Sequence, residues 1–360
     1  MAGNFVQLHN HTHYSLLDGA SKVPDLVKRV KELGMPAVGI TDHGNMHGAY
    51  ELWRAAVDSG VKPIIGIEAY VTPETARQDK TRVSWDTNWT PVPGHARNPD
   101  DVSGGGLITH LTMWAENDEG LVNLIKASSV ANLEGRVMRY PRMDKEVLST
   151  YSKGVIASSG CPSGIIQTRL RLGQFDEALR AAGEFQDIFG KDNFYIELMD
   201  HGLSIESKVT GDLLTIAKKL GAPLLATNDS HYVMEADKDA QDAMLCINSG
   251  ATLDDPNRFK FEGSGYYIKS AEEMRELFKD HPDACDNTLE IAERCNVIFD
   301  DHEDGAFMPQ FDCPEGWDET SLFLKKVEEG LEKRYDGNPP MEVLKQADYE
   351  CGVICQMQFC

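Results

Sequence analysis

The chain has 360 residues and a formal net charge of −23, because 58 Asp and Glu residues outnumber 35 Lys and Arg residues. A chain this acidic is neither a generally basic nucleic-acid coat nor a binder of anionic membranes. The acid is unevenly distributed: residues 1–180 hold 19 basic and 20 acidic side chains, whereas residues 181–360 hold 16 and 38. We therefore expect an anionic substrate to prefer the first half.

The rest of the composition is that of a globular enzyme. Hydrophobic residues make up 41% of the chain and charged residues 26%, which argues against disorder. No apolar run approaches the roughly 20 residues of a membrane helix, and no secretory signal is visible at the N-terminus. The eight Cys have no framework spacing, so we expect reduced thiols and a cytoplasmic protein that does not bind membranes.

Short apolar runs alternate with longer amphipathic segments along most of the chain. The expected strands are 5–9, 37–41, 63–70, 107–113, 154–158, 194–198 and 223–227. The expected helices are 24–34 with Ser21 as its cap, 45–60, 119–132, 176–189 and 204–221. Strand–helix units in series predict a parallel α/β fold.

Two segments depart from this rhythm. Residues 78–106 combine Trp, Pro and a run of three Gly, which predicts an insertion loop. From residue 282 onward, helical patterns at 287–295, 320–335 and 341–359 surround an irregular acidic segment at 300–317. We therefore expect one domain over 1–281 and a mainly helical region over 282–360. The last helical pattern has no stop signal, so we interpret that region as truncated.

Most residues able to bind a metal ion lie at or just after the ends of the expected strands. Active sites of α/β barrels are built at that end, whereas open sheets gather ligands at one switch point. Ligands from many successive strands therefore favour a barrel. The candidates are His9, His11, His13, Asp18, Asp42, His43, Glu68, His110, Cys161, Asp200, His201, Asp229 and His231.

The spacing of the candidates indicates how they would be used. Residues two apart in a strand point to the same side, so His-x-His presents two imidazoles to one ion. Both His9 with His11 and His11 with His13 meet this condition, and Asp229 with His231 repeats it. One such pair is more often a polar face or a turn, so the prediction depends on the joint pattern. So many ligands predict a multi-ion cluster, which is typical of phosphoester hydrolysis.

The same motifs resemble those of a known family. Residues 8–20 and 37–45 are similar to the opening motifs of the PHP (polymerase and histidinol phosphatase) domain, and 62–68, 107–111, 159–164 and 226–232 match further motifs in order. The resemblance covers the whole chain and is strongest to the version at the N-terminus of bacterial DNA polymerase III alpha subunits, especially those of actinobacteria. It implies a distorted seven-stranded β/α barrel.

The resemblance also implies the ligand set and the chemistry. The number of ligands, which exceeds what one ion needs, predicts two to three divalent ions, and the Cys ligand favours Zn, with Mn or Fe as alternatives. The resemblance leaves His13 outside the cluster and implies metal-dependent 3′→5′ exonuclease proofreading, with His9, His11, Asp18, Asp229 and His231 as catalytic candidates. The implied metal ligands are His9, His11, Asp18, His43, Glu68, His110, Cys161, Asp229 and His231.

One departure limits the resemblance. The paired Asp motif of the family's polymerase palm is absent, so we expect 282–360 to be a linker and the beginning of the palm and thumb region. Two other functions remain open: a phosphatase for a small phosphomonoester, and a metal-stabilised structural module of the polymerase.

The resemblance implies DNA as the main partner, bound at a single-stranded or mismatched primer 3′ end. Other replicase subunits, such as the sliding clamp, would bind through parts of the polymerase outside this chain.

His201 is an even choice between two roles: support of the cluster or of a phosphate, and an ordinary loop histidine. Arginines on loops and helices are often merely solvated, but five are candidates for contacts with the DNA backbone. These are Arg136, Arg139, Arg142, Arg169 and Arg171.

Overall fold

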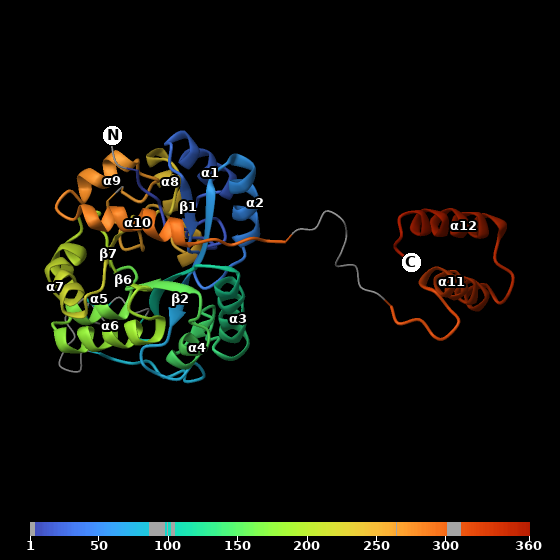
Figure 1. The fold of residues 1–360 in the computed structure, drawn as a ribbon, viewed down its shortest axis with the longest axis horizontal. Helices are drawn as coiled ribbons and strands as arrows, with labels where there is room; N and C mark the ends of the chain where they lie inside the picture. Colours follow the sequence, from blue (N-terminus) through green and yellow to red (C-terminus); the bar gives the residue numbers. More distant parts are fainter. Residues whose placement is uncertain (1–3, 86–97, 99, 102–104, 264, 301–310) are drawn as a thin grey trace. The chain divides into compact units, whose positions relative to one another are not determined.

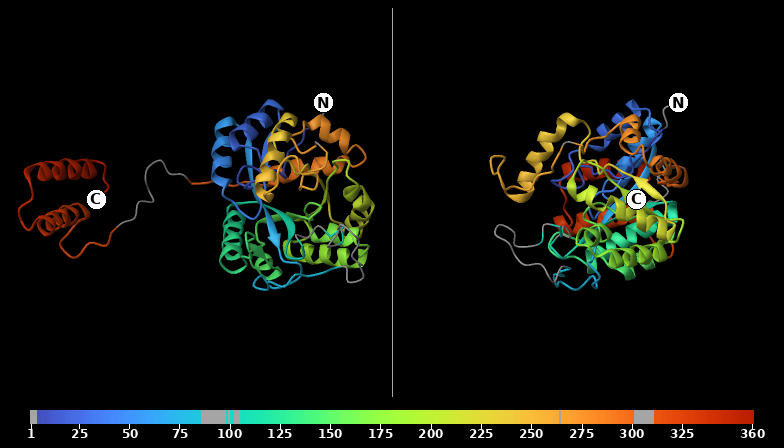
Figure 2. Two further views of the ribbon diagram at one scale, coloured as in Figure 1. Left: turned by 180° about the vertical axis from the view of Figure 1, so that it is seen from behind. Right: turned by 90° about the vertical axis from the view of Figure 1, so that its left-hand side faces the viewer.

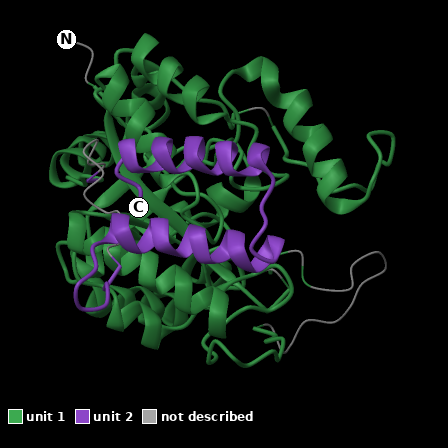
Figure 3. Ribbon diagram, turned by 90° about the vertical axis from the view of Figure 1, so that its right-hand side faces the viewer, with its two compact units in different colours: residues 1–299 green, residues 300–360 purple. Residues whose placement is uncertain are grey.

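The computed structural model describes residues 4–85, 98, 100–101, 105–263, 265–300 and 311–360. The chain forms two compact units, unit 1 at residues 1–299 and unit 2 at residues 300–360 (Figure 3). Much of the expected insertion loop, and residues 301–310 of the acidic segment, lie outside the described residues.

Unit 1 is built around a curled mixed sheet of seven strands (Figure 1). The strand order is β1-β2-β3-β5-β6-β7, and the short β4 pairs with β2. The pairs β1–β2, β5–β6 and β6–β7 are parallel, whereas β3 is antiparallel to both β2 and β5. The strands are β1 (Ala37–Ile40), β2 (Lys62–Val71), β3 (Thr109–Ala115), β4 (Arg142–Met143), β5 (Val155–Ser158), β6 (Phe194–Leu198) and β7 (Leu224–Ala226).

The first expected strand, residues 5–9, forms isolated bridges that join the two edges of this sheet. Gln7 pairs in parallel with Val38 of β1, and Asn10 pairs in parallel with Ser230 just after β7. The approach to β1 is so close that a Cβ on Gly39 would lie 2.6 Å from the Leu8 carbonyl oxygen. The segment therefore closes the sheet into a distorted barrel, as the sequence predicts.

The remaining expected strands are present with shifted ends, but the expected all-parallel arrangement is wrong at β3. Gly66 of β2 lies opposite Trp114 of β3, and Val71 lies opposite Thr109. A parallel connection needs a long crossover, usually a helix. The described residues between β2 and β3 contain no helix, and the chain returns antiparallel.

Helices surround the barrel, and the five expected before residue 222 are all present. The predicted Ser21 cap is wrong: Lys22 is the N-cap of α1, because Ser21 pairs with Thr12 in an extended bridge. Four further helices, α4, α5, α8 and α9, have no counterpart among the helices expected from the sequence. The helices are α1 (Val23–Glu32), α2 (Ala49–Ser59), α3 (Asp118–Glu134), α4 (Lys145–Thr150), α5 (Ile165–Arg171), α6 (Phe175–Phe189), α7 (Ser204–Leu220), α8 (Lys238–Ser249), α9 (Ala271–Leu277) and α10 (Pro282–Arg294), with a 3₁₀ turn η1 (Glu235–Asp237).

An apolar cluster fills the barrel at the starts of its parallel strands, away from the candidate ligands. Trp114 is fully buried there, and its indole nitrogen donates to the Leu8 carbonyl at 3.1 Å. Ile291 and Cys295, from α10 and its cap, belong to the same cluster. Unit 1 consequently extends to Phe299, beyond the boundary expected at 281, because α10 seals this end of the barrel. The strand residues of the cluster are Val6, Leu8, Ala37, Ile64, Trp114, Ile156, Tyr195 and Leu225.

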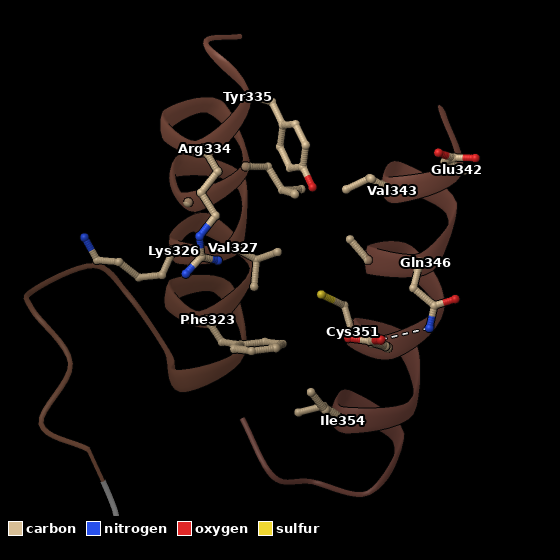
Figure 4. A pocket seen from close by; sticks show the side chains of 14 residues that line it. Phe323, Lys326, Val327, Arg334, Tyr335, Glu342, Val343, Gln346, Cys351 and Ile354 are labelled. Atoms are coloured by element: carbon tan, nitrogen blue, oxygen red, sulfur yellow. Dashed lines mark hydrogen bonds between the residues drawn. The ribbon is translucent and has the colours of Figure 1, made fainter. Parts of the chain in front are cut away.

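Unit 2 is a pair of helices, α11 (Glu319–Tyr335) and α12 (Met341–Gln356), and confirms the helical patterns predicted there. Asp318 caps α11 by accepting a hydrogen bond from the Ser321 amide at 2.7 Å. A cavity of about 670 Å³ lies between the helices, lined on facing sides by Phe323 and Ile354 among others (Figure 4). Across the described parts of both units, no helix is long and apolar enough to span a membrane.

Candidate metal centre

Seven of the nine predicted ligands lie together at one end of the barrel, in three overlapping groups. In each group, one ligand atom per residue lies within 4.8 Å of the others. His11 belongs to the first two groups and His43 to the last two, so the cluster is continuous. The groups are His9 with His11 and Asp229, His11 with His43 and His231, and His43 with Glu68 and His110.

Asp18 and Cys161 join the cluster at its edges. One Asp18 carboxylate oxygen lies 2.8 Å from His43 Nε2 and 3.8 Å from His231 Nε2. Cys161 Sγ lies 3.4 Å from His110 Nδ1, and the Cys161 side chain is buried. Burial raises the pKa of this thiol well above its usual value, so an ion binding there would displace a proton.

Hydrogen bonds fix the orientation of the two histidines on the first segment. His9 Nδ1 lies 2.7 Å from the Glu197 carboxylate, to which it donates. His11 Nδ1 donates to Ser15 Oγ at 2.9 Å, because the Ser15 hydroxyl proton is itself donated to Asp42 at 2.7 Å. Both rings therefore present Nε2 to the cluster, where these two atoms lie 3.3 Å apart.

The turn after β7 supplies the last two ligands. His231 Nδ1 donates to the Asp229 carbonyl at 2.8 Å, which leaves His231 Nε2 facing the cluster. Asp229 has φ of +44°, an uncommon backbone conformation that Asp tolerates better than most residues. The Asn228 amide holds this turn in place by donating to the carbonyls of Gly265 and Tyr267 at 2.9 and 2.8 Å.

Several buried ligand atoms of the cluster have no hydrogen-bond partner among the described residues. Buried polar atoms are nearly always hydrogen bonded, and an unsatisfied one is costly. Here they face one another in a single cluster of imidazole, carboxylate and thiol groups, which is the donor set of Zn, Mn or Fe. The residues therefore fit a group of divalent cations. These atoms are Asp18 Oδ1, His43 Nδ1, Glu68 Oε1 and Oε2, Asp229 Oδ1 and His231 Nε2. Two of them, His43 Nδ1 and Glu68 Oε2, lie 2.6 Å apart as an ion pair.

The pKa values of the cluster show how charge is balanced in it. Burial opposes a charge on His9, but Asp229 and Glu197 outweigh it and raise the pKa of His9 well above its usual value. Burial, together with the charges of His43 and His231, lowers the pKa of His11 to about 3. Burial favours the neutral form of Glu68, yet His110 and His43 lower the pKa of its carboxyl well below the usual range. The carboxylates are therefore ionised, and ions would replace the compensating protons.

Glu197 is a functional residue that the sequence patterns did not reveal. Its side chain is fully buried in β6, where one oxygen accepts from His9 and from Thr227 Oγ1 at 2.5 Å. The other oxygen accepts from Ser158 Oγ. The available signal is a lone carboxylate within the apolar run of residues 194–198.

The other candidate ligands lie outside the cluster. Asp42 accepts from the Thr12 amide at 2.7 Å and from Ser15, so it braces the first segment. His201 has both ring nitrogens engaged, with Glu206 at 2.7 Å and with the Asn228 carbonyl at 2.9 Å. It supports the turn before Asp229 and presents no free nitrogen to an ion or phosphate. The His13 side chain is 40% exposed.

Two of the five candidate arginines are wrong as DNA contacts because they are buried. Arg142 is fully buried and donates to carbonyl groups, including those of Arg77 and Asp79 at 2.7 Å. Arg171 is 3% exposed and donates to the carbonyls of Asp100 and Pro162.

The other three arginines differ in exposure. Arg169 is held between Glu74, at 2.5 Å, and the face of Trp85. Arg136 and Arg139 are exposed. Arg139 donates to Asn248 at 2.5 Å, and Asn248 donates to the carbonyl of Leu17, beside Asp18.

Comparisons with known proteins show the family to which the chain belongs. The family model described as PHP domain matches residues 7–201. The chain is 50% identical over 357 residues to the DNA polymerase III subunit alpha of Mycobacterium leprae (strain TN), and 49% identical over 357 residues to that of Mycobacterium tuberculosis (strain ATCC 25618 / H37Rv). The corresponding subunit of Borreliella burgdorferi is 39% identical over 359 residues.

These matches confirm the resemblance that the motifs indicate. They cover 99% of this chain and therefore include both units. They cover 29–30% of the relatives, so the chain spans less than a third of the length of the curated relatives it matches.

Proposed function

Because the chain belongs to the PHP domain family, we propose that unit 1 is a metal-dependent phosphoesterase that removes nucleotides from DNA 3′ ends. The observation that carries this proposal is the cluster of seven ligand residues in three overlapping groups, with Asp18 and Cys161 at its edges and buried ligand atoms that lack hydrogen bonds. Since the relatives are DNA polymerase III alpha subunits, the domain would serve as the proofreading part of a replicative polymerase. Unit 2 would begin the region that leads to the polymerase palm and thumb.

The three overlapping groups would hold two to three divalent ions, with Cys161 and Asp18 completing the set. A thiolate ligand favours Zn, while Mn and Fe suit the imidazole and carboxylate ligands. Ions bound there would stabilise the negative charge of a phosphodiester and lower the pKa of a water molecule.

The protein's own part is to hold these groups and to handle the proton. Glu197 and Ser15 fix the rings of His9 and His11 by their Nδ1 atoms, so neither imidazole rotates when the cluster is filled. His231 Nε2 carries no hydrogen bond, because the ring proton is donated from Nδ1. His231 and Asp229 are therefore the candidates to orient the attacking water or accept its proton.

A single-stranded or mismatched 3′ end is the expected substrate. It would approach the half of the chain that is nearly neutral, where exposed Arg136 and Arg139 lie. Phosphate contacts of this kind position a strand without reading its sequence, as proofreading requires.

The test is nucleotide release by the purified chain, whose metal content is measured on the same sample. Labelled single-stranded and 3′-mismatched DNA is incubated with Zn or Mn, and in parallel with a chelator. We expect metal-dependent release of 3′ nucleotides, which His11→Asn abolishes. His13→Asn is the matched control and keeps the activity, because His13 lies outside the ligand groups.

Other results would favour other functions. Intact DNA in the presence of bound ions would overturn the proposal. Turnover of histidinol phosphate with inert DNA would indicate a phosphatase. A lower melting temperature after chelation, with no hydrolysis of either substrate, would indicate a structural module.

A further inference from the structure

A cavity of about 470 Å³ adjoins the ligand cluster on the side of Asp18 and His231. It lies between α8 and the loop that follows it, both drawn in gold in Figure 2. Two of its walls touch the cluster directly. The Phe261 ring meets the His231 ring edge-on with centroids 4.6 Å apart, and Gln241 donates to the Asp18 carbonyl at 3.1 Å. The lining residues are Tyr232, Lys238, Asp239, Gln241, Asp242, Arg258, Lys260, Phe261, Glu262 and Gly263.

The charges around this cavity balance, which argues against a second phosphate site. Its cationic residues Lys238, Arg258 and Lys260 face the same number of carboxylates. Arg258 already pairs with Asp242 at 2.5 Å. Phosphate sites typically concentrate cationic donors, because charge-assisted hydrogen bonds are the strong ones. A neutral, partly aromatic group therefore suits this cavity better than a second anion.

The lining offers an aromatic ring and an unsatisfied polar pair to such a group. Phe261 is held by Tyr266, with ring centroids 4.7 Å apart, and by an edge contact with Phe259 at 6.0 Å. Among the described residues, Arg258 Nε and Asp242 Oδ1 are buried and have no hydrogen-bond partner. A free donor and a free acceptor beside an aromatic ring match the chemistry of a nucleobase, which has a π-face and a polar edge.

We propose that this cavity holds the base of the 3′-terminal nucleotide while its phosphate lies at the ligand cluster. The proposal rests on the proposed function and names the unit that the site binds, a nucleoside monophosphate. The volume falls within the roughly 300–1,000 Å³ that is typical of small-ligand sites. Because every base has a π-face, stacking on Phe261 would accept all four bases.

The test compares two ligands that share a sugar and a phosphate but differ in the base. Purified metal-loaded chain is titrated by calorimetry with deoxyadenosine 5′-monophosphate and, separately, with deoxyribose 5-phosphate. The nucleotide should bind at least about tenfold more tightly, since stacking on an aromatic side chain gives an effect of this order. Equal affinities in the unmodified chain would overturn the proposal without recourse to any variant.

Two matched variants locate the effect. Phe261→Leu should reduce the ratio of the two affinities to near one, whereas Phe175→Leu on α6 should leave it unchanged, because Phe175 does not line the cavity. An equal loss in both variants would overturn the assignment to this cavity.

A nucleotide-release assay on the same samples separates the two proposals. Base-dependent binding without release supports the cavity and contradicts the proposed hydrolysis. Release without base-dependent binding would overturn the proposed base site but not the proposed hydrolysis.

Discussion

Each of the two units is stabilised internally in a different way. Unit 1 has fully buried side chains such as Leu52 and Ile65, and its first segment ties one sheet edge to the other. Neither helix of unit 2 has a buried residue, and its ion pairs, such as Lys325 with Glu328, lie on the surface. Surface pairs contribute little to stability, whereas buried side chains contribute several kcal/mol. A cluster of nine ligands at fixed positions requires a closed, buried core such as that of unit 1.

Leucine truncation in each unit would test this contrast most strongly. Leu52→Ala should lower the free energy of unfolding by about 2–5 kcal/mol, because it leaves a cavity in a closed core. Leu331→Ala, on the partly open groove between α11 and α12, should cost less than about 1 kcal/mol. Urea unfolding followed by tryptophan fluorescence would measure the first, and hydrogen exchange of α11 the second. Similar costs in both units would contradict the contrast.

Loss of the Glu197 charge would show whether the buried frame of unit 1 controls its site. Glu197→Gln keeps the volume but weakens the hold on His9, so metal affinity should fall by about 10–100-fold. Competition with a chelating dye measures this affinity. Glu177→Gln, a substitution of a half-exposed carboxylate on α6, is the matched control and should leave affinity unchanged. Equal affinities for the two variants would show that His9 does not depend on this hydrogen bond.

The pH dependence of metal retention should be next in size. Burial opposes the charge of His43, but Tyr70 and Glu68 outweigh it, so the pKa of His43, like that of His9, lies well above its ordinary value of 6.5. Both protons stabilise the ion-free fold at low pH, and this stabilisation is lost as the pH rises through the raised pKa values. An ion must displace these protons, so metal affinity should fall about tenfold for each unit by which the pH is lowered, for each proton displaced.

Dye competition at pH 6, 7 and 8 would measure this slope. The dependence of metal affinity on pH should flatten once the pH exceeds the raised pKa values. Affinity that does not change across this range would mean that the imidazoles are neutral before the ions bind.

The arginines on the surface of unit 1 should give the smallest effect. Substituting both Arg136 and Arg139 with Gln should reduce the salt slope of DNA binding by about one for each DNA phosphate that these side chains neutralise. Arg54→Gln, which removes a surface pair with Asp58 on α2, serves as control. A slope unchanged by the double substitution would show that DNA does not cross this face.

The sequence predicted the cluster well because its signal repeats. Every expected strand except 194–198 has a ligand at or near one end, so an error in one strand would not move the others. Strand direction has no such signal, since the apolar run at 107–113 reads the same for either orientation of β3.

Features that depend on distant partners were harder to predict. Arg142 looks like a solvated cation in sequence, and only the carbonyl groups that surround it show that it is buried. In the sequence, Glu197 is only a single charged residue in an expected strand. Its role becomes visible only from its hydrogen bond with His9 in the structure. The extension of unit 1 to Phe299 was not visible for a similar reason, because α10 packs against strands far from it along the chain.

The closure of the barrel by its first segment has a consequence for synthesis. His9 and His11 are made long before Ser230, whose amide binds the His9 carbonyl. Pairings between such distant residues form late in folding. During translation, the segment that carries His9 and His11 therefore remains unpaired until the residues after β7 have been made. A nascent chain stalled before residue 231 should retain fewer ions than one stalled beyond residue 299, where the unit ends.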